Sequence, residues 1–319
     1  MSLTRYGLEE NIFGGKYGNP LDCPDNNAHY VTVEGFGEQK PSIDQWFELK
    51  HNQSQFFLIY GPTGTGRTSI ANYMADKFRL YGPPLKVITR VANDYHVESM
   101  HIWMKELVTK SRRQGVDLHQ SIISRFKEEI ITKEPYKDPT IYKDIIYDVL
   151  RELEEKQRSL VAIFENVVNP KLFTFAQEVL VPPDDPHKEN VVVIFTTSDE
   201  SMNSDFLKLN PMPMGLPPIK LRHLTGDDVF SLILQRWRQF NPASPPPFDE
   251  DMVKRVFSIK PYPIRRAVKA LEFMMLKKIE RIEKGESCWP EDNSLKLEPG
   301  EIAEFLLRFE AEFPEREIR

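Results

Sequence analysis

This sequence contains few cysteines, no long apolar run and no excess of basic charge. Its 319 residues include only two cysteines, Cys23 and Cys288, whose separation matches no metal-ligand or redox spacing. We therefore expect free thiols in a reducing compartment. No apolar run reaches membrane-spanning length, and residues Met1–Arg5 lack the apolar core of a signal peptide. These absences predict an intracellular protein, cytoplasmic or nuclear, with no membrane partner.

The overall composition indicates a globular chain without a general affinity for nucleic acid. The net charge is -6, so the surface as a whole is not expected to attract phosphate backbones. A length of 319 residues suffices for one large domain or two modest ones with real cores. The seven histidines show no metal spacing. No G-x-S-x-G turn, the local signature of one class of serine hydrolases, occurs in the chain.

A glycine-rich turn stands between a short apolar run, Phe56–Tyr60, and a helical pattern, Ser69–Ala75. This order is the context of a phosphate-binding P-loop. Glycines let backbone N–H groups turn towards an anion, and the helix N-terminus adds partial positive charge. The sequence therefore predicts a nucleotide-phosphate site at Gly61, Pro62, Thr63, Gly64, Thr65, Gly66, Arg67, Thr68 and Ser69.

One position departs from the P-loop pattern. The lysine that contacts the β- and γ-phosphates is replaced by Arg67, whereas Thr68 stands where a hydroxyl reaches Mg²⁺. Arginine is planar and forked where lysine is a compact point charge, so the exchange is not conservative at a crowded phosphate. We expect nucleotide binding to survive the exchange and catalytic placement of the γ-phosphate to suffer.

Further apolar runs alternate with helical patterns along the chain. Besides Phe56–Tyr60, the predicted strands are Leu85–Val91, Leu160–Phe164, Val191–Phe195 and a weaker Ile219–Leu221. Near-continuous runs rich in branched residues are typical of strands buried on both faces. We expect two or three helices between residues 93 and 160, and in the last of them the apolar residues from Ile145 to Leu153 recur at helical spacing, with Glu152, Glu154, Glu155 and Lys156 on the other face. The predicted fold class is α/β, a five-stranded parallel sheet with helices on both faces.

Two segments flank this predicted core. From residue 224 onward the pattern is helical only, and Thr225–Asp228 predicts a capping box that opens a helix over Val229–Phe240. Further helices are expected at about 249–258, 264–284 and 301–311. The predicted domains are an N-terminal arm (1–37), an α/β core (38–223) and a helical lid (224–319). Apolar residues expected to anchor the arm by burial are Tyr6, Leu8, Ile12 and Phe13.

A P-loop core followed by a helical lid resembles the AAA+ ATPases, from about residue 35 onward. Gly61–Thr68 matches the Walker A loop, and Phe164–Asn166 stands where the family has its Walker B acidic pair. Thr197 matches the sensor 1 position, with Ser198 as the off-by-one alternative. The run at residues 262–267 resembles the lid motif G-x-x-R-x-A, which makes Arg265 the candidate sensor 2.

The resemblance implies ATP and Mg²⁺ as cofactors. It implies Thr68 and Glu165 as metal ligands, and Glu165, Asn166 and Thr197 as catalytic residues. In the family, the residue after the Walker B metal ligand is a glutamate that activates water. Asn166 can orient a water but cannot accept its proton. A shifted register would make Glu165 the base and leave Phe164 in the metal position, so either register is defective.

A second catalytic part is also missing from the pattern. AAA+ neighbours contribute an arginine finger, worth about 10³–10⁵ in rate. Between the fourth and fifth predicted strands the only basic residue is Lys208, and we favour a solvated lysine there. Basic residues also follow the lid motif in the segment 265–284. We interpret them first as a solvated helix face paired with Glu272, Glu280 and Glu283, and second as a DNA surface.

We therefore interpret the chain as an ATP-binding AAA+ switch or assembly module with weak or absent hydrolysis. The alternative is an active oligomeric AAA+ ATPase that remodels a protein or DNA complex. A third hypothesis is a scaffold whose site stays empty. The resemblance implies assembly as a homo-oligomer or with other AAA+ subunits. Adenine rather than guanine rests on the resemblance alone.

Overall fold

The computed structural model describes residues 6, 8, 55–78, 82–91, 95–136, 138–181, 190–209, 218–260, 262–285 and 295–314. The chain divides into two compact units. An α/β unit comprises residues 41–62 and 67–221, and a helical unit comprises residues 1–40, 63–66 and 222–319. The predicted domain boundaries at residues 37 and 223 stay predictions. Cys23, Cys288, Ile12 and Phe13 lie outside the described residues.

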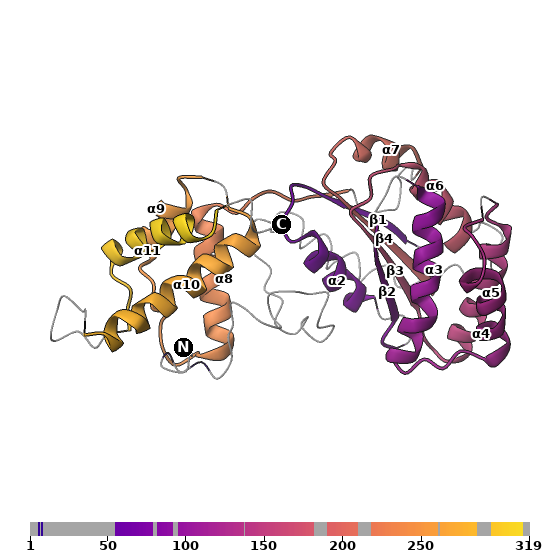
Figure 1. Cartoon of the computed structure of the whole chain (residues 1–319), viewed down its shortest axis with the longest axis horizontal. Helices are drawn as coiled ribbons and strands as arrows, with labels where there is room; N and C mark the ends of the chain where they lie inside the picture. Colours follow the sequence, from indigo (N-terminus) through magenta and orange to yellow (C-terminus); the bar gives the residue numbers. More distant parts are fainter. Residues whose placement is uncertain are drawn as a thin grey trace. The chain divides into compact units, whose positions relative to one another are not determined.

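The α/β unit is built on a five-stranded parallel sheet, which confirms the predicted fold class (Figure 1). The strand order is β2-β3-β4-β1-β5, so the first strand lies between the fourth and the fifth. Continuously apolar segments form these strands because both faces of the sheet are covered. The strands are β1 (Gln55–Tyr60), β2 (Leu85–Arg90), β3 (Leu160–Glu165), β4 (Val191–Thr197) and β5 (Ile219–Lys220).

The strand register aligns the carboxyl ends of the strands. Tyr60 at the end of β1 is the partner of Thr197 at the end of β4. Arg90 at the end of β2 is the partner of Glu165 at the end of β3. β4 extends two residues beyond the prediction, because its final threonines continue to pair with Ile59 and Tyr60. In parallel α/β sheets, the carboxyl edge is where ligands bind.

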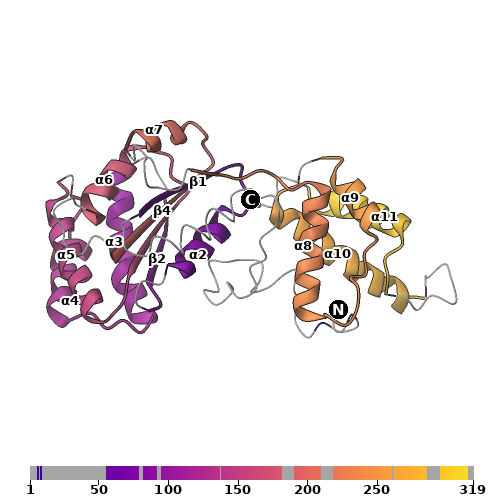
Figure 2. The ribbon, with the colours of Figure 1, turned by 180° about the vertical axis from the view of Figure 1, so that it is seen from behind.

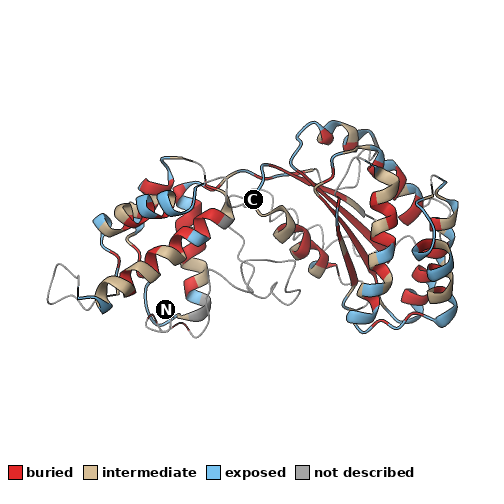
Figure 3. Ribbon diagram, in the orientation of Figure 1, coloured by how far each residue is buried: buried red, intermediate tan, exposed pale blue. Residues whose placement is uncertain are grey.

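Helices cover both faces of the sheet, as predicted (Figure 2). α2 (Arg67–Lys77) lies on one face, and α3 (His96–Arg113) and α6 (Lys171–Leu180) lie on the other. The strands are almost entirely buried (Figure 3). Aromatic rings of α3 and α6 contact rings of the central strands, as in the pairs Trp103–Phe164 and Phe173–Phe195. The remaining helices of this unit are α4 (Gln120–Phe126), the π-helix η5 (Lys127–Ile131), α5 (Thr140–Glu155) and α7 (Met202–Leu209).

α5 follows the predicted amphipathic pattern except at one glutamate. Its apolar residues, from Ile145 to Leu153, are fully buried as the spacing predicts. Glu152 was placed on the solvent face by that spacing, but it is buried. Both of its carboxylate oxygens accept the His119 N–H, at 2.7 and 2.8 Å, and one accepts Lys156 Nζ at 2.7 Å. A loop that folds back onto α5 thus converts a surface position into a buried, hydrogen-bonded one.

The helical unit contains α8 (Gly226–Phe240), α9 (Glu250–Phe257), α10 (Ile264–Glu283) and α11 (Pro299–Glu312). The predicted capping box is confirmed: the Asp228 carboxylate accepts the Thr225 N–H at 2.7 Å, and the Thr225 hydroxyl accepts the Asp228 N–H at 3.3 Å. α8 therefore starts at Gly226, earlier than expected. Within the described part of the chain, no helix has the length and apolarity needed to cross a membrane.

Two residues of the N-terminal arm pack into the helical unit. Tyr6 and Leu8 are both buried, as predicted. The Tyr6 ring meets Trp237 edge-on at 6.3 Å, and Asn241 Nδ2 donates to the Tyr6 carbonyl at 3.1 Å. Burial raises the pKa of the Tyr6 hydroxyl, which donates to the Met275 carbonyl at 3.5 Å. These contacts fix the beginning of the chain against residues more than 230 positions away.

Acidic residues pair with the basic residues in the second half of α10 and at its C-terminal end. These ion pairs form both within the helix and with α11, as the solvated-face interpretation expects for this part of the stripe. Glu280 is one of the glutamates expected as partners, and two further partners come from α11. Hydrogen bonds from two lysines lower the pKa of Glu280 to about 2. The pairs are Lys277–Glu280, Lys284–Glu280, Lys278–Glu301 and Arg281–Glu304.

A buried histidine in α3 makes stability sensitive to acid. His101 Nδ1 lies 3.0 Å from the Tyr142 hydroxyl, which also accepts the Tyr136 N–H at 3.0 Å. The hydroxyl therefore donates to a neutral His101. Burial lowers the pKa of His101, as does the nearby Lys105.

We expect the unfolding free energy to fall as pH drops below about 6.5, because only the unfolded chain then gains this proton easily. The loss attributable to His101 at pH 5.5 should not exceed about 1.4 kcal/mol, which is the limit for one proton over one pH unit. Urea unfolding of wild type and His101→Gln at pH 7.5 and 5.5 measures it, since glutamine cannot titrate. Equal pH dependence in both proteins would contradict a neutral, buried His101.

Candidate functional site

The loop after β1 requires glycine at its first position. Gly61 has φ of +153°, and a Cβ there would lie 2.4 Å from the Leu221 carbonyl oxygen. Its N–H donates to the Thr197 carbonyl at 3.2 Å, and the Leu221 N–H donates to the Tyr60 carbonyl at 2.7 Å. The loop therefore leaves the sheet between the ends of β4 and β5, where no side chain fits at residue 61.

The tip of the loop, residues 63–66, belongs to the helical unit. Gly64 has φ of +82°, and its carbonyl accepts the Ile264 N–H at 2.8 Å. A Cβ on Gly64 would lie 2.7 Å from the Pro263 Cβ. Glycine at position 64 therefore serves two purposes. It adopts the positive φ of the loop, and it lets the loop backbone approach the first turn of α10 closely.

The first turn of α2 presents the basic residue and the hydroxyl of the predicted site. Arg67 is half-buried, and its Nη1 is buried without a hydrogen-bond partner. Thr68 and Ser69 follow on the same turn, and this turn carries no acidic residue. A buried, unpartnered guanidinium nitrogen at a helix N-terminus is suited to an anion, since such an atom is costly to leave unsatisfied.

Two buried polar residues that the sequence analysis did not single out hold this turn in place. Asn72 Nδ2 donates to the Thr68 carbonyl at 3.0 Å. The Asn72 oxygen in turn accepts Lys86 Nζ of β2 at 3.2 Å, and the same Nζ donates to Asp76 at 2.8 Å. Asn72 was the only hint of these contacts in the sequence, since it is a polar residue within an apolar helical pattern. A buried asparagine needs hydrogen-bond partners for its amide.

Glu165, the last residue of β3, faces the first turn of α2. It is 5% exposed, and its Oε1 has no hydrogen-bond partner. Burial raises the pKa of its carboxyl group, while a hydrogen bond from the Thr68 side chain and the positive charges of Arg90 and Arg67 oppose that rise. The pKa of Arg67 is lowered by burial, against the effect of Glu165. The structure thus brings Arg67, Thr68 and Glu165 together, and their binding roles stay predictions.

Asn166 occupies a strained turn directly after Glu165. Its φ is +60°, a conformation in which asparagine is better tolerated than most residues with a Cβ. The Asn166 N–H donates to the Thr196 hydroxyl at 3.1 Å, and the next N–H, of Val167, donates to the Thr196 carbonyl at 2.8 Å. The end of β4 therefore determines where Asn166 lies.

Thr197 is buried and makes two hydrogen bonds. Its hydroxyl donates to the Val167 carbonyl at 2.7 Å and accepts the Asp199 N–H at 3.1 Å. It therefore ties the end of β4 to the turn after β3. Ser198, the alternative sensor 1 residue, is exposed. A sensing role for Thr197 stays a prediction, and the structure explains its position by these two bonds.

Two other predicted positions have different outcomes. The side chain of Arg265 lies outside the described residues, so its sensor 2 role stays a prediction. Its neighbour Arg266 is buried and pairs with Glu310 of α11 at 3.1 Å. Lys208 is exposed and pairs with Asp205 at 2.8 Å, in agreement with a solvated lysine. Over the described ranges, no group of three or more His, Cys, Asp or Glu side chains could hold a metal ion.

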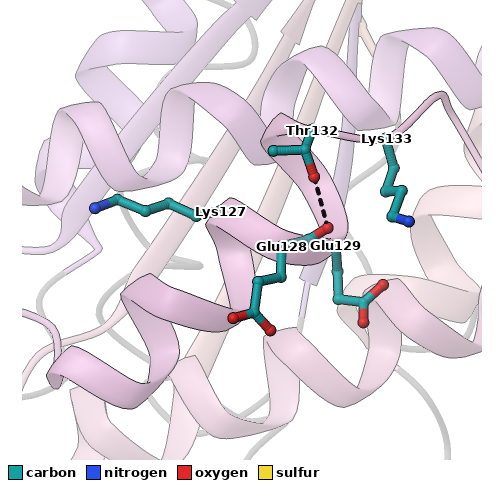
Figure 4. Close-up of a pocket in the computed structure, with 5 residues that line it drawn as sticks. All are labelled: Lys127, Glu128, Glu129, Thr132 and Lys133. Atoms are coloured by element: carbon teal, nitrogen blue, oxygen red, sulfur yellow. Dashed lines mark hydrogen bonds between the residues drawn. The ribbon is translucent and has the colours of Figure 1, made fainter.

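A shallow depression over the π-helix lies apart from these residues (Figure 4). The Thr132 hydroxyl donates to the Glu128 carbonyl at 2.8 Å there, which closes the helix end. Side chains around it carry charges of both signs and are exposed or half-buried, so we assign it no function. The lining residues are Lys127, Glu128, Glu129, Thr132 and Lys133.

Comparison with solved structures finds the same fold at low sequence identity. The ORC2 protein of Aeropyrum pernix, solved as ADPNP–ADP complexes, matches with a TM-score of 0.61 at 12% identity, over 97% of this chain and 74% of that one. Cdc6p of Pyrobaculum aerophilum matches with a TM-score of 0.53 at 11% identity, over 87% and 67%. Neither a protein-family model nor a curated protein matches the sequence. At these identities the similarity establishes the fold alone.

Proposed function

We propose that this chain, which has the fold of the AAA+ P-loop ATPases, binds ATP and acts as a nucleotide-dependent switch or assembly module with weak or absent hydrolysis. One observation carries the proposal. The buried Arg67 Nη1 has no hydrogen-bond partner and could bind an anion, and the position nearby where the resemblance expects a catalytic glutamate holds Asn166. The site is equipped to hold phosphate and poorly equipped to activate water.

Phosphate binding is supported by three features at the start of α2. The loop glycines adopt positive φ, the helix N-terminus presents free N–H groups, and Arg67 offers an unpaired nitrogen. The A. pernix ORC2 protein was solved with ADPNP and ADP, which favours an adenine nucleotide here. The loop residues 61–69 are the proposed phosphate contacts.

Thr68 and Glu165 are the residues that would hold Mg²⁺. A hydroxyl and a carboxylate that already share a hydrogen bond form the donor set that P-loop proteins use for this ion. Mg²⁺ supplies charge neutralisation of the phosphates when it is bound. The contribution of this chain is to place the hydroxyl on α2 and the carboxylate at the end of β3.

Weak hydrolysis follows from what Asn166 and Thr197 can do. An amide oxygen orients water but does not accept its proton at neutral pH, and a general base is typically worth about 10²–10⁴ in rate. The Thr197 hydroxyl already donates to the Val167 carbonyl, so donation to a phosphate would require that bond to break. Both features favour slow turnover.

A slow site is suited to switching, because a bound nucleotide can persist long enough to bias assembly. Differential contacts with the γ-phosphate would shift the population between two surfaces, and Arg265 is the proposed reporter. Other AAA+ subunits, as identical copies or related chains, are the proposed partners. The ion pairs of Lys277, Lys278 and Arg281 reduce the positive charge that this part of α10 could offer to DNA.

Equilibrium binding of ATP and ADP with Mg²⁺, with phosphate release followed in the same samples, tests the proposal. We expect ATP to bind without steady release. The Arg67→Ala variant should lose most of the ATP binding. The Arg113→Ala variant is the control and should retain it, because Arg113 is an exposed arginine at the C-terminal end of α3. Steady, oligomer-dependent release abolished by Glu165→Gln would instead indicate an active remodelling ATPase. Absence of binding would indicate a scaffold.

A further inference from the structure

A second arginine, Arg90, lies beside Glu165 at the carboxyl edge of the sheet. It is the last residue of β2 and the register partner of Glu165. Partnered residues of parallel strands point to the same face of the sheet. The Val91 N–H donates to the Glu165 carbonyl at 2.8 Å, which holds the two strand ends together. Arg90 is exposed, so its guanidinium is accessible at the carboxyl edge.

The charges of Arg67, Arg90 and Glu165 together favour an anion over a divalent cation. The two arginines contribute two positive charges and the glutamate one negative, so these three side chains carry a net charge of +1. Both arginines act electrostatically on Glu165. A guanidinium fork binds phosphate oxygens with two parallel hydrogen bonds, whereas it repels a metal ion.

We propose that Arg90 is a second phosphate-binding residue, and that Arg67 and Arg90 together make nucleotide binding at this site largely independent of Mg²⁺. The inference rests on the proposed nucleotide function. Arg67 reaches the phosphates from the N-terminus of α2, and Arg90 reaches them from the neighbouring edge of the sheet. Mg²⁺ bound at Thr68 and Glu165 then adds little to affinity, because the phosphate charge is already compensated.

Titration of ATP in Mg²⁺ and in excess EDTA tests this inference on the full chain. For wild type we expect the two dissociation constants to agree within roughly threefold. Arg90→Gln should raise the dissociation constant in EDTA about tenfold, and by less in Mg²⁺, because the metal substitutes for the lost charge. Arg90→Lys should show an intermediate effect, since it keeps the charge and loses the fork. Arg113→Gln is the matched exposed control and should behave as wild type.

The outcomes separate this inference from the proposed function. Tight ATP binding in Mg²⁺ that weakens tenfold or more in EDTA would overturn metal independence and leave nucleotide binding intact. A wild-type dissociation constant for Arg90→Gln in EDTA would overturn the role of Arg90. No binding in either condition would overturn the proposed function together with the inference. Equal melting temperatures of the variants establish that their folds are intact.

Discussion

Replacing Asn166 by glutamate is expected to raise the rate of ATP hydrolysis by about 10². Asn166 follows Glu165 at the end of β3, where a carboxylate could accept a proton from a water beside the γ-phosphate. The amide of Asn166 can only orient that water. The φ of +60° at this position should make glutamate less stable than asparagine by about 1 kcal/mol, which the fold can tolerate. Phosphate release at saturating ATP measures the change.

Asn166→Gln is the matched control, because glutamine has the length of glutamate without its basic oxygen. It should leave turnover near the wild-type rate. Asn166→Gly should relieve the backbone strain and also leave turnover low, which separates chemistry from conformation. A glutamate variant that binds ATP normally but hydrolyses it no faster would show that Arg67 or another part of the site limits the reaction.

Replacing Gly61 by alanine is expected to lower the free energy of unfolding by about 3 kcal/mol. The added Cβ would lie 2.4 Å from the Leu221 carbonyl oxygen, and overpacking of this kind costs roughly 1–3 kcal/mol. The φ of +153° adds about 1–2 kcal/mol for a residue with a Cβ. Urea unfolding followed by circular dichroism measures the loss, and ATP binding should weaken with it because the loop must move.

Gly115→Ala is the control for this substitution. Gly115 has φ of +68°, and a Cβ there would meet no atom within 4 Å, so only the backbone strain of about 1 kcal/mol applies. The difference between the two variants isolates the clash with Leu221. Equal losses would show that the end of β5 yields freely to an added methyl group, which would contradict a tight fit at residue 61.

The strands were predictable because both faces of the sheet are buried. Runs such as Leu160–Phe164 and Val191–Phe195 are apolar at every position, and such runs carry the signal without any partner. The end of β4 was harder, since Thr196 and Thr197 are polar and pair only because Ile59 and Tyr60 lie beside them. Glu152 was misplaced for the same reason: its partner, the His119 N–H, comes from a distant turn.

The site was predictable where its residues are consecutive. The loop Gly61–Thr68 is a local motif, and its glycine spacing reflects local backbone needs. The proposed role of Arg90 has no local signal, because its neighbour Glu165 lies 75 positions away and is reached only through the register of β2 on β3. Lys86 and Asn72 were missed because their hydrogen bond joins β2 to α2. No local pattern encodes such a pair.

The sequence alone determined the order of the strands, the candidate phosphate loop and the presence of an asparagine after Glu165, because each is a property of neighbouring residues. Only the tertiary structure decided the strand order β2-β3-β4-β1-β5 and the gathering of Arg67, Arg90, Thr68 and Glu165 at one edge. Strand pairing joins segments far apart in the chain through backbone hydrogen bonds that every residue type offers alike. Which side chains meet is therefore set by packing of the whole sheet, and the charge of the site emerges only there.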